Sequence, residues 1–223
     1  SAQQIKCITP PLSNQQFSEY LAQLQEYLNN DEDRLPSNSI HIWFHVILIN
    51  GGGDVPNSWL NDQIDQLNLD FAGTTLSFVL EGVDRVDNPD WAVNCATGNT
   101  FNEGTIYEMK QALAIDPRTI YNVYIVQSLG NAGGHAVFPT NNQDDITHGV
   151  VIAKNTLPGG GSVRFNMGRT LVHETGHYLG LLHTFDGSGA CVDGDGLSDT
   201  PVHIVNQYCP PESTNTCPQH PGN

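Results

Sequence analysis

The sequence predicts a mixed α/β (α+β) fold, and two observations lead to this prediction. Runs rich in β-branched and aromatic residues are typical of strands, and they occur at 40–49, 74–83, 121–129, 134–139 and 148–153. Segments with apolar residues at helical spacing alternate with these runs. A chain of 223 residues is long enough to bury a substantial core, as one domain or as two lobes that share a cleft.

Three amphipathic helices are predicted from apolar spacing. Their apolar positions are Phe17, Leu21, Leu24 and Leu28 in the first, Leu60, Ile64, Leu67 and Phe71 in the second, and Ile106, Met109 and Leu113 in the third. Ser13 is the expected cap of the first helix, and Thr105 and Glu108 are spaced as a capping box for the third.

The composition is strongly acidic, with 8 Lys and Arg against 24 Asp and Glu and a formal net charge of −16. Such a charge repels the phosphates of nucleic acids and of anionic lipids. No apolar run approaches the roughly 20 residues that cross a membrane. We therefore expect neither nucleic acid nor a membrane among its partners.

Five cysteines are present: Cys7, Cys95, Cys191, Cys209 and Cys217. None of them has the Cys-x-x-Cys spacing that is typical of cysteine zinc sites. Disulfide bonds are the better interpretation, and they indicate a secreted, extracellular protein.

The motif HETGHYLGLLH begins at His173 and carries the most specific chemical signal in the chain. His173 and His177 are one helical turn apart, so both imidazoles project from one face, with Glu174 beside them. Gly180 tolerates the left-handed conformation that ends a helix, which brings His183 back toward the pair. Three imidazoles and one open position are a typical ligand set of catalytic zinc.

The alternative for this motif is three unrelated histidines on a polar helix. The extended spacing is far more selective than a bare His-Glu-x-x-His pair, so we favour the zinc site. The remaining histidines are expected to be core or surface residues rather than ligands: His41, His45, His135, His148, His203 and His220.

The extended motif is that of the metzincin zinc proteases, and its surroundings resemble the pappalysin family, especially the secreted fungal and bacterial members. The resemblance rests on LPGGG…FNMGRTLVHETGHYLGLLHTF, a following cysteine, and GDGLSDTP; IHIWFHVI and the pair GHAVFP…HGVVIA add to it. It implies a metzincin-like catalytic domain with a twisted, mostly parallel five-stranded sheet, an antiparallel edge strand, an active-site helix and an irregular cysteine-rich C-terminal part.

The residues and the resemblance together predict a zinc-dependent endopeptidase. Zinc on the three histidines is expected to hold a water and lower its pKa toward ~7, and Glu174 to act as the general base. Metzincins bind protein or peptide substrates antiparallel along an edge strand, which here corresponds to Gly134, His135, Ala136 and Val137.

Two other functions are kept as alternatives: a catalytically silent zinc-containing binding protein, and a zinc amidase that acts on small substrates. Glu174 argues against the first, because a structural zinc site has no use for a base. The expected edge strand favours a polypeptide substrate over a small one.

The acidic segment DGDGLSDTP follows the motif, and in pappalysin relatives the matching segment binds calcium. The resemblance points to Asp195 and Thr200 as calcium ligands, and hard oxygen ligands suit this ion. An acidic, solvated loop is the alternative. The resemblance also pairs Cys191 with Cys217 and leaves Cys209 as the odd thiol.

Cys7 lies in KCITPP, which loosely resembles the pappalysin pro-segment stretch in which a cysteine blocks zinc. The family pattern has Arg before and Gly after that cysteine, whereas Lys6 and Ile8 stand here. We therefore favour a Cys7–Cys95 disulfide and keep the zinc-blocking thiol as the alternative.

The expected organisation has three parts. Residues 1–39 form a helical segment, a remnant of a pro-segment in one interpretation; 40–183 form the catalytic subdomain; and 184–223 form an incomplete C-terminal subdomain. Metzincins carry a methionine turn after the third histidine, whereas Met109 and Met167 both precede His173. The expectation is a fragment of a longer enzyme, with its own C-terminal fragment as a candidate partner.

Overall fold

The computed structural model describes residues 39–139, 145–185, 191, 194–197, 199–204 and 216–217, together with Glu19 and Ala22. Residues 39–180 belong to one compact unit, and the described residues from Leu181 onward belong to a second. Ser13, Cys7, Cys209, His220 and most of the first predicted helix lie outside the described residues. No described helix is long and apolar enough to span a bilayer.

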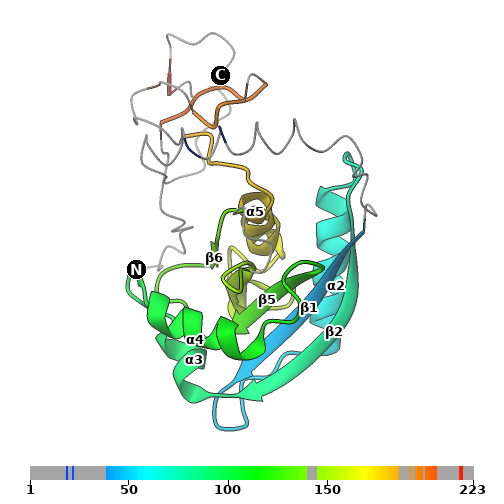
Figure 1. Ribbon diagram of the computed structural model, residues 1–223, viewed down its shortest axis with the longest axis vertical. Helices are drawn as coiled ribbons and strands as arrows, with labels where there is room; N and C mark the ends of the chain where they lie inside the picture. Colours follow the sequence, from blue (N-terminus) through cyan, green and yellow to red (C-terminus); the bar gives the residue numbers. More distant parts are fainter. Residues whose placement is uncertain are drawn as a thin grey trace. The chain divides into compact units, whose positions relative to one another are not determined.

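A five-stranded sheet forms the centre of the first unit (Figure 1). Its strand order is β2-β1-β5-β7-β6, with β2 at Ser77–Asp87, β1 at Ser39–Leu48, β5 at Ile120–Val126, β7 at Val150–Ala153 and β6 at Gly134–Ala136. Four of the strands run parallel, and β6 pairs antiparallel with β7 at one edge. The predicted mostly parallel sheet with an antiparallel edge strand is therefore confirmed.

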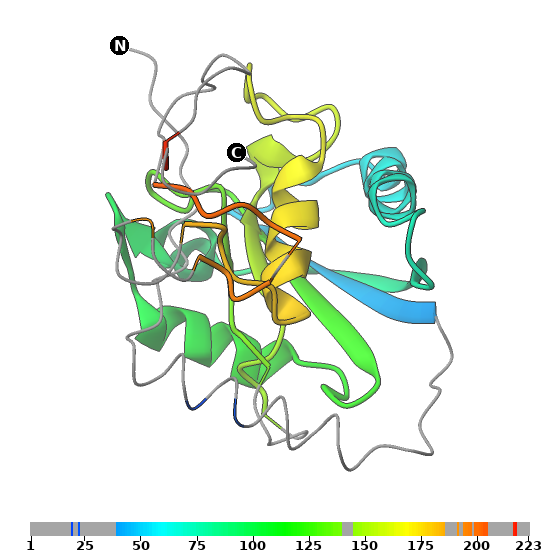
Figure 2. The same cartoon turned by 90° about the horizontal axis from the view of Figure 1, so that it is seen from above.

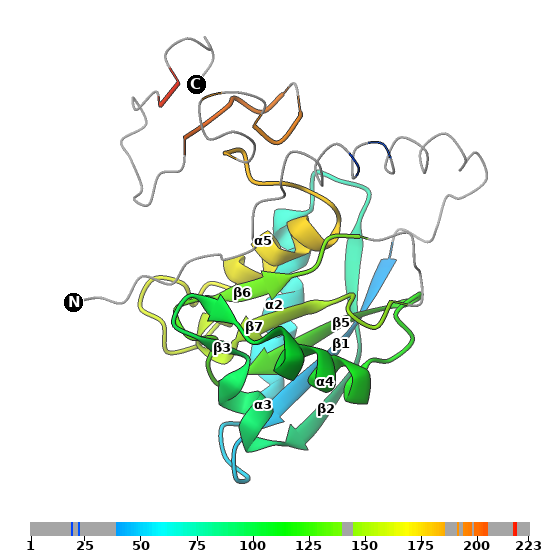
Figure 3. The ribbon, with the colours of Figure 1, turned by 60° about the vertical axis from the view of Figure 1, so that its left-hand side comes forward.

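Alternating side chains of the central strands pack into two apolar cores, one on each face of the sheet. Phe44 of β1 and Val123 of β5 lie in the core shared with α2 (Asn57–Asp70) and α5 (Arg169–Tyr178). The next residue along β5, Tyr124, lies in the other core, which includes residues of α3 (Pro89–Asn94) and α4 (Glu103–Leu113). Figures 2 and 3 show the sheet between these two helical layers. Burial on both faces explains why these strands are apolar almost throughout.

The start of α4 differs from the prediction. The Asn102 side chain accepts a hydrogen bond from the backbone N–H of Thr105 at 3.3 Å, so Asn102 is the cap and the helix begins at Glu103. The capping box of Thr105 and Glu108 is therefore wrong, and Thr105 is a buried residue inside the first turn. Asparagine is an equally good cap, and it lies only three residues earlier.

Other observed element boundaries also differ from the predicted ones, and some short elements were not predicted. The strand expected at 74–83 lies at Ser77–Asp87, and the strand expected at 134–139 ends at Ala136. Helix α3, the hairpin of β3 (Ala96–Thr97) and β4 (Thr100–Phe101), and the 3-10 turn η1 (Lys154–Thr156) were missed.

Cys95 carries a free thiol, so the predicted Cys7–Cys95 disulfide is wrong. Cys95 is fully buried at the end of α3, and its thiol donates to the carbonyl of Trp91 at 3.2 Å. Burial raises the pKa of this thiol to about 12. The Cys191–Cys217 disulfide is present in the second unit, as the family resemblance implied.

Candidate metal centre

Helix α5 carries the first part of the motif and is held by its apolar side. Leu171 lies fully buried in the core against the sheet. The helix follows Gly168, which adopts the left-handed conformation with φ of 74°, and the Gln63 side chain of α2 donates to the Gly168 carbonyl at 3.0 Å. The glycine before the motif thus lets the chain turn sharply into the helix.

The helix ends as the sequence predicted. Gly180 has φ of 96°, and its N–H donates to the carbonyl of His177 at 2.9 Å. The N–H of Leu179 donates to the backbone carbonyl of Thr175 at 2.9 Å, and this hydrogen bond closes the last turn. A residue with a Cβ is strained in this left-handed conformation, so glycine is required where the chain turns toward His183.

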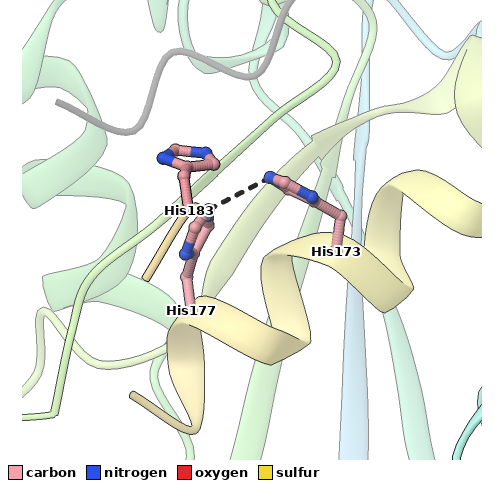
Figure 4. Close-up of side chains that lie close together, drawn as sticks. All are labelled: His173, His177 and His183. Atoms are coloured by element: carbon pink, nitrogen blue, oxygen red, sulfur yellow. Dashed lines mark hydrogen bonds between the residues drawn. The ribbon is translucent and has the colours of Figure 1, made fainter. Parts of the chain in front are cut away.

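The three histidines of the motif come together (Figure 4). Their ligand nitrogens all lie within 4.8 Å of one another, and the Nε2 atoms of His173 and His177 are 3.0 Å apart. Two nitrogens on a tetrahedral zinc ion, each about 2.0–2.1 Å from the metal, lie roughly 3.4 Å apart. His173 is exposed, whereas His177 and His183 are buried. The donor set and its convergence fit zinc.

Glu174 lies next to His173 and is fully buried. Its side chain packs against the backbone of Gly134, at the start of edge strand β6. The carboxylate is thus confined between the edge strand and the helix that carries two of the histidines.

Aromatic rings flank the buried histidines. Phe138, just after β6, meets the His177 ring edge to face with centroids 5.4 Å apart. The Phe185 ring stacks on the His183 ring, with centroids 4.5 Å apart. These contacts restrict the orientation of both imidazoles, and the sequence analysis missed them, although both phenylalanines stand in the segments that carry the family resemblance.

A hydrogen bond anchors the middle of α5 to the sheet, and the sequence analysis missed this contact too. The hydroxyl groups of Tyr121 on β5 and Thr175 are 2.9 Å apart, and the Tyr178 ring stacks on Tyr121 with centroids 4.0 Å apart. Burial raises the pKa of Tyr121 well above its usual value and that of Tyr178 to about 12, so both phenols remain neutral near pH 7.

The predicted substrate strand lies at the edge of the sheet. Gly134, His135 and Ala136 form β6, and Val137 follows the strand. In the described part of the chain, no strand pairs with the outer side of β6. The His135 ring is buried against Phe101, with centroids 4.2 Å apart, so it packs in the interior.

The histidine triad is the single cluster of three potential metal-ligating His, Cys, Asp or Glu side chains in the described ranges. His41 contacts Glu81, and His45 is buried between Asp84 and Asn122. Both are thus accounted for by contacts within the sheet.

The predicted calcium ligands lie in a turn of the second unit. The Oδ1 atom of Asp195 accepts a hydrogen bond from the N–H of Leu197 at 3.0 Å, and Thr200 follows in the same segment. This bond is typical of an Asx-turn, which forms without any ion. Calcium binding by Asp195 and Thr200 stays a prediction.

Comparison with known proteins gives consistent matches. The Peptidase_M43 family model, described as "Pregnancy-associated plasma protein-A", matches residues 104–220. A protein named "Extracellular metalloprotease" from Sordaria macrospora is 35% identical over 191 residues, which is 82% of this chain and 64% of that protein. A protein of the same name from Arthroderma benhamiae is 36% identical over 212 residues, which is 90% of this chain and 69% of that one. The chain thus spans about two thirds of the length of these relatives.

Two solved structures share the fold. Tannerella forsythia promirolysin mutant E225A has a TM-score of 0.62 at 21% identity, covering 84% of this chain and 71% of that one. Mirolysin in complex with compound 9 has a TM-score of 0.57 at 23% identity, covering 72% and 71%. At these identities the likeness concerns the fold alone.

Proposed function

Because the chain belongs to the pregnancy-associated plasma protein-A (pappalysin) family of metalloproteases, we propose that it is a zinc-dependent endopeptidase that hydrolyses internal peptide bonds of proteins. The observation that carries this proposal is the convergence of three histidine side chains beside a fully buried glutamate. A structural zinc site needs the ligands but not the adjacent carboxylate.

His173, His177 and His183 are the residues that would hold the ion. A zinc ion bound there would supply Lewis-acid chemistry, polarising a carbonyl and acidifying a water molecule. The chain itself orients the ligands: α5 spaces the first two, and the turn at Gly180 leads to the third.

Glu174 is the proposed general base and general acid. Its carboxylate takes a proton from the attacking water and then delivers that proton to the nitrogen of the leaving amine. Burial confines this side chain next to His173, so little conformational freedom remains to be lost during the reaction.

Substrate binding is proposed at the outer edge of β6. An extended peptide can pair with the backbone of residues 134–137, which makes recognition depend on main-chain hydrogen bonds. The relatives named extracellular metalloproteases support secretion of this chain as well.

The test is digestion of casein by the purified protein, by Glu174→Gln and by Glu108→Gln. Glu108 is an exposed residue of α4, so its substitution controls for the loss of one negative charge. We expect Glu174→Gln to retain zinc and to lose activity by a factor of about 10²–10⁴, with Glu108→Gln unaffected.

Three outcomes separate the alternatives. Zinc binding without cleavage of casein or of small amides would identify a silent binding protein. Hydrolysis of small amides alone would identify an amidase. Casein cleavage that a zinc chelator does not inhibit would contradict the proposed chemistry altogether.

A further inference from the structure

Gly134 and Glu174 approach each other so closely that no side chain fits at position 134. A Cβ atom built on Gly134 would lie 2.5 Å from Cγ, 2.7 Å from Oε1 and 2.8 Å from Cδ of Glu174. Carbon atoms in contact are normally about 3.5–4.0 Å apart. The Glu174 side chain therefore lies in the space that a residue other than glycine would fill.

The requirement for glycine here is steric rather than conformational. Gly134 is absent from the glycines with positive φ, which include Gly168 and Gly180. An alanine would therefore suit the backbone of β6 at this position, and the three heavy atoms nearest to its Cβ all belong to Glu174.

Neither the strand nor the helix can easily relieve that conflict. Gly134 is paired in register with Ile152 of β7, and the Gly133 carbonyl accepts from the N–H of Ala153 at 2.9 Å. Helix α5 is held by the buried Leu171 and by the bond between Thr175 and Tyr121. The Glu174 side chain is the part that would have to move, and it is enclosed on all sides.

We propose that Gly134 is a positioning residue for Glu174. The bare backbone of β6 sets how far the carboxylate extends from α5, and so sets its place relative to His173 and to a substrate paired with the strand. This inference rests on the proposed function, in which Glu174 transfers the proton.

The first test is the kinetics of Gly134→Ala, with Gly161→Ala as the matched control. A Cβ at Gly161 meets nothing within 4 Å, and Gly161 has no positive φ. A misplacement of about 1 Å costs on the order of a hundredfold in rate. We expect kcat of Gly134→Ala to fall by about that factor with KM and zinc content unchanged, and Gly161→Ala to match the wild type. Wild-type kcat in Gly134→Ala would overturn the proposal.

The second test needs no activity and therefore separates this inference from the proposed function. Gly134→Ala is introduced into the wild type and into Glu174→Ala, and Tm is measured for all four proteins. Overpacking should lower Tm by about 2–10 °C in the wild-type background and not in Glu174→Ala, where the space is free. An equal decrease in Tm in the wild-type and Glu174→Ala backgrounds would overturn the proposal.

Failure of Gly134→Ala to fold does not leave the question open. Recovery of folding in the double variant Gly134→Ala/Glu174→Ala would support the conflict between the two side chains. Failure of both variants would show that position 134 requires glycine for a reason other than Glu174, and would overturn the proposal. A wild-type chain that cleaves no substrate would refute the proposed function. The Tm comparison would then still test the steric conflict between position 134 and Glu174.

Discussion

The hydroxyl groups of Tyr121 and Thr175 are 2.9 Å apart, and this hydrogen bond ties the central strand β5 to the middle of α5. Both residues are buried, and they are 54 positions apart in the sequence. The bond lies one residue from Glu174, and the ring of Tyr178, three residues after Thr175, stacks on the same tyrosine with centroids 4.0 Å apart.

Tyr121→Phe is expected to lower the free energy of unfolding by about 1–2 kcal/mol, because the buried hydroxyl of Thr175 loses its partner. Tyr107→Phe is the control, since Tyr107 is 46% exposed. Urea denaturation of both variants measures the effect. Equal stability of Tyr121→Phe and Tyr107→Phe would show that the hydroxyl pair does not hold the helix.

Removal of a metal ligand should abolish zinc binding. His177→Ala and His183→Ala each leave two imidazoles, and we expect zinc content to fall from about one ion per chain to nearly none. His41→Ala is the control, because His41 contacts Glu81 on the neighbouring strand. Atomic absorption after dialysis gives the metal content, and a chelator should lower Tm only in proteins that still bind zinc. Full zinc content in His183→Ala would remove that residue from the ligand set.

Local patterns in the sequence were enough to predict the parts of the site that lie within eleven consecutive residues. His173, His177 and the turn at Gly180 follow from helical geometry and from the conformational freedom of glycine. The mostly parallel sheet and its antiparallel edge strand came from the family resemblance, whereas the strand order was not predicted, since periodicity alone does not say which strands are neighbours.

The contacts that the sequence could not predict join residues far apart in the chain. The close approach of Gly134 to Glu174 arises only when β6 packs against α5. The alternation of residues along the strand does not predict this contact. Cys95 was assigned to a disulfide by counting cysteines, whereas in the structure it is a free thiol that lies among core residues. Asn102 was passed over as a cap because Thr105 and Glu108 matched a known motif.

The Cys95 thiol is expected to be unreactive in the native protein. It is fully buried with its pKa raised to about 12, so little thiolate exists at pH 8 and reagents have no access to it. Thiol titration with Ellman's reagent should give the same native count for the wild type and for Cys95→Ala. After denaturation under non-reducing conditions, the wild type should show one thiol more. One thiol fewer in the denatured wild type than in Cys95→Ala would restore the Cys7–Cys95 disulfide, because the substitution would then release the Cys7 thiol.

The last prediction concerns Lys110, a buried residue of α4 whose side chain lies on the face of the sheet opposite to α5. Its ammonium group donates to the carbonyls of Thr147 and Gly149, and it lies 5.9 Å from the centroid of the Tyr124 ring. Burial lowers the pKa of Lys110 from its ordinary 10.5 to about 8, and the nearby charges of Glu103 and Asp145 oppose only part of this shift.

The sign of the resulting pH dependence follows from proton binding. Between pH 8 and pH 10.5 the unfolded chain keeps the Lys110 proton and the folded chain has lost it, so the free energy of unfolding gains a contribution that rises with pH. Below pH 8 both states are protonated, and the burial of the charge destabilises the fold by a constant amount. Tyr121 and Tyr178 act in the opposite direction only above pH 10, because their pKa values are raised by folding. Urea denaturation of the wild type and of Lys110→Met at pH 7.5 and pH 9.5 isolates the lysine. We expect the stability difference between the two proteins to shift in favour of the wild type at the higher pH, and a difference independent of pH would show that Lys110 titrates at its ordinary value.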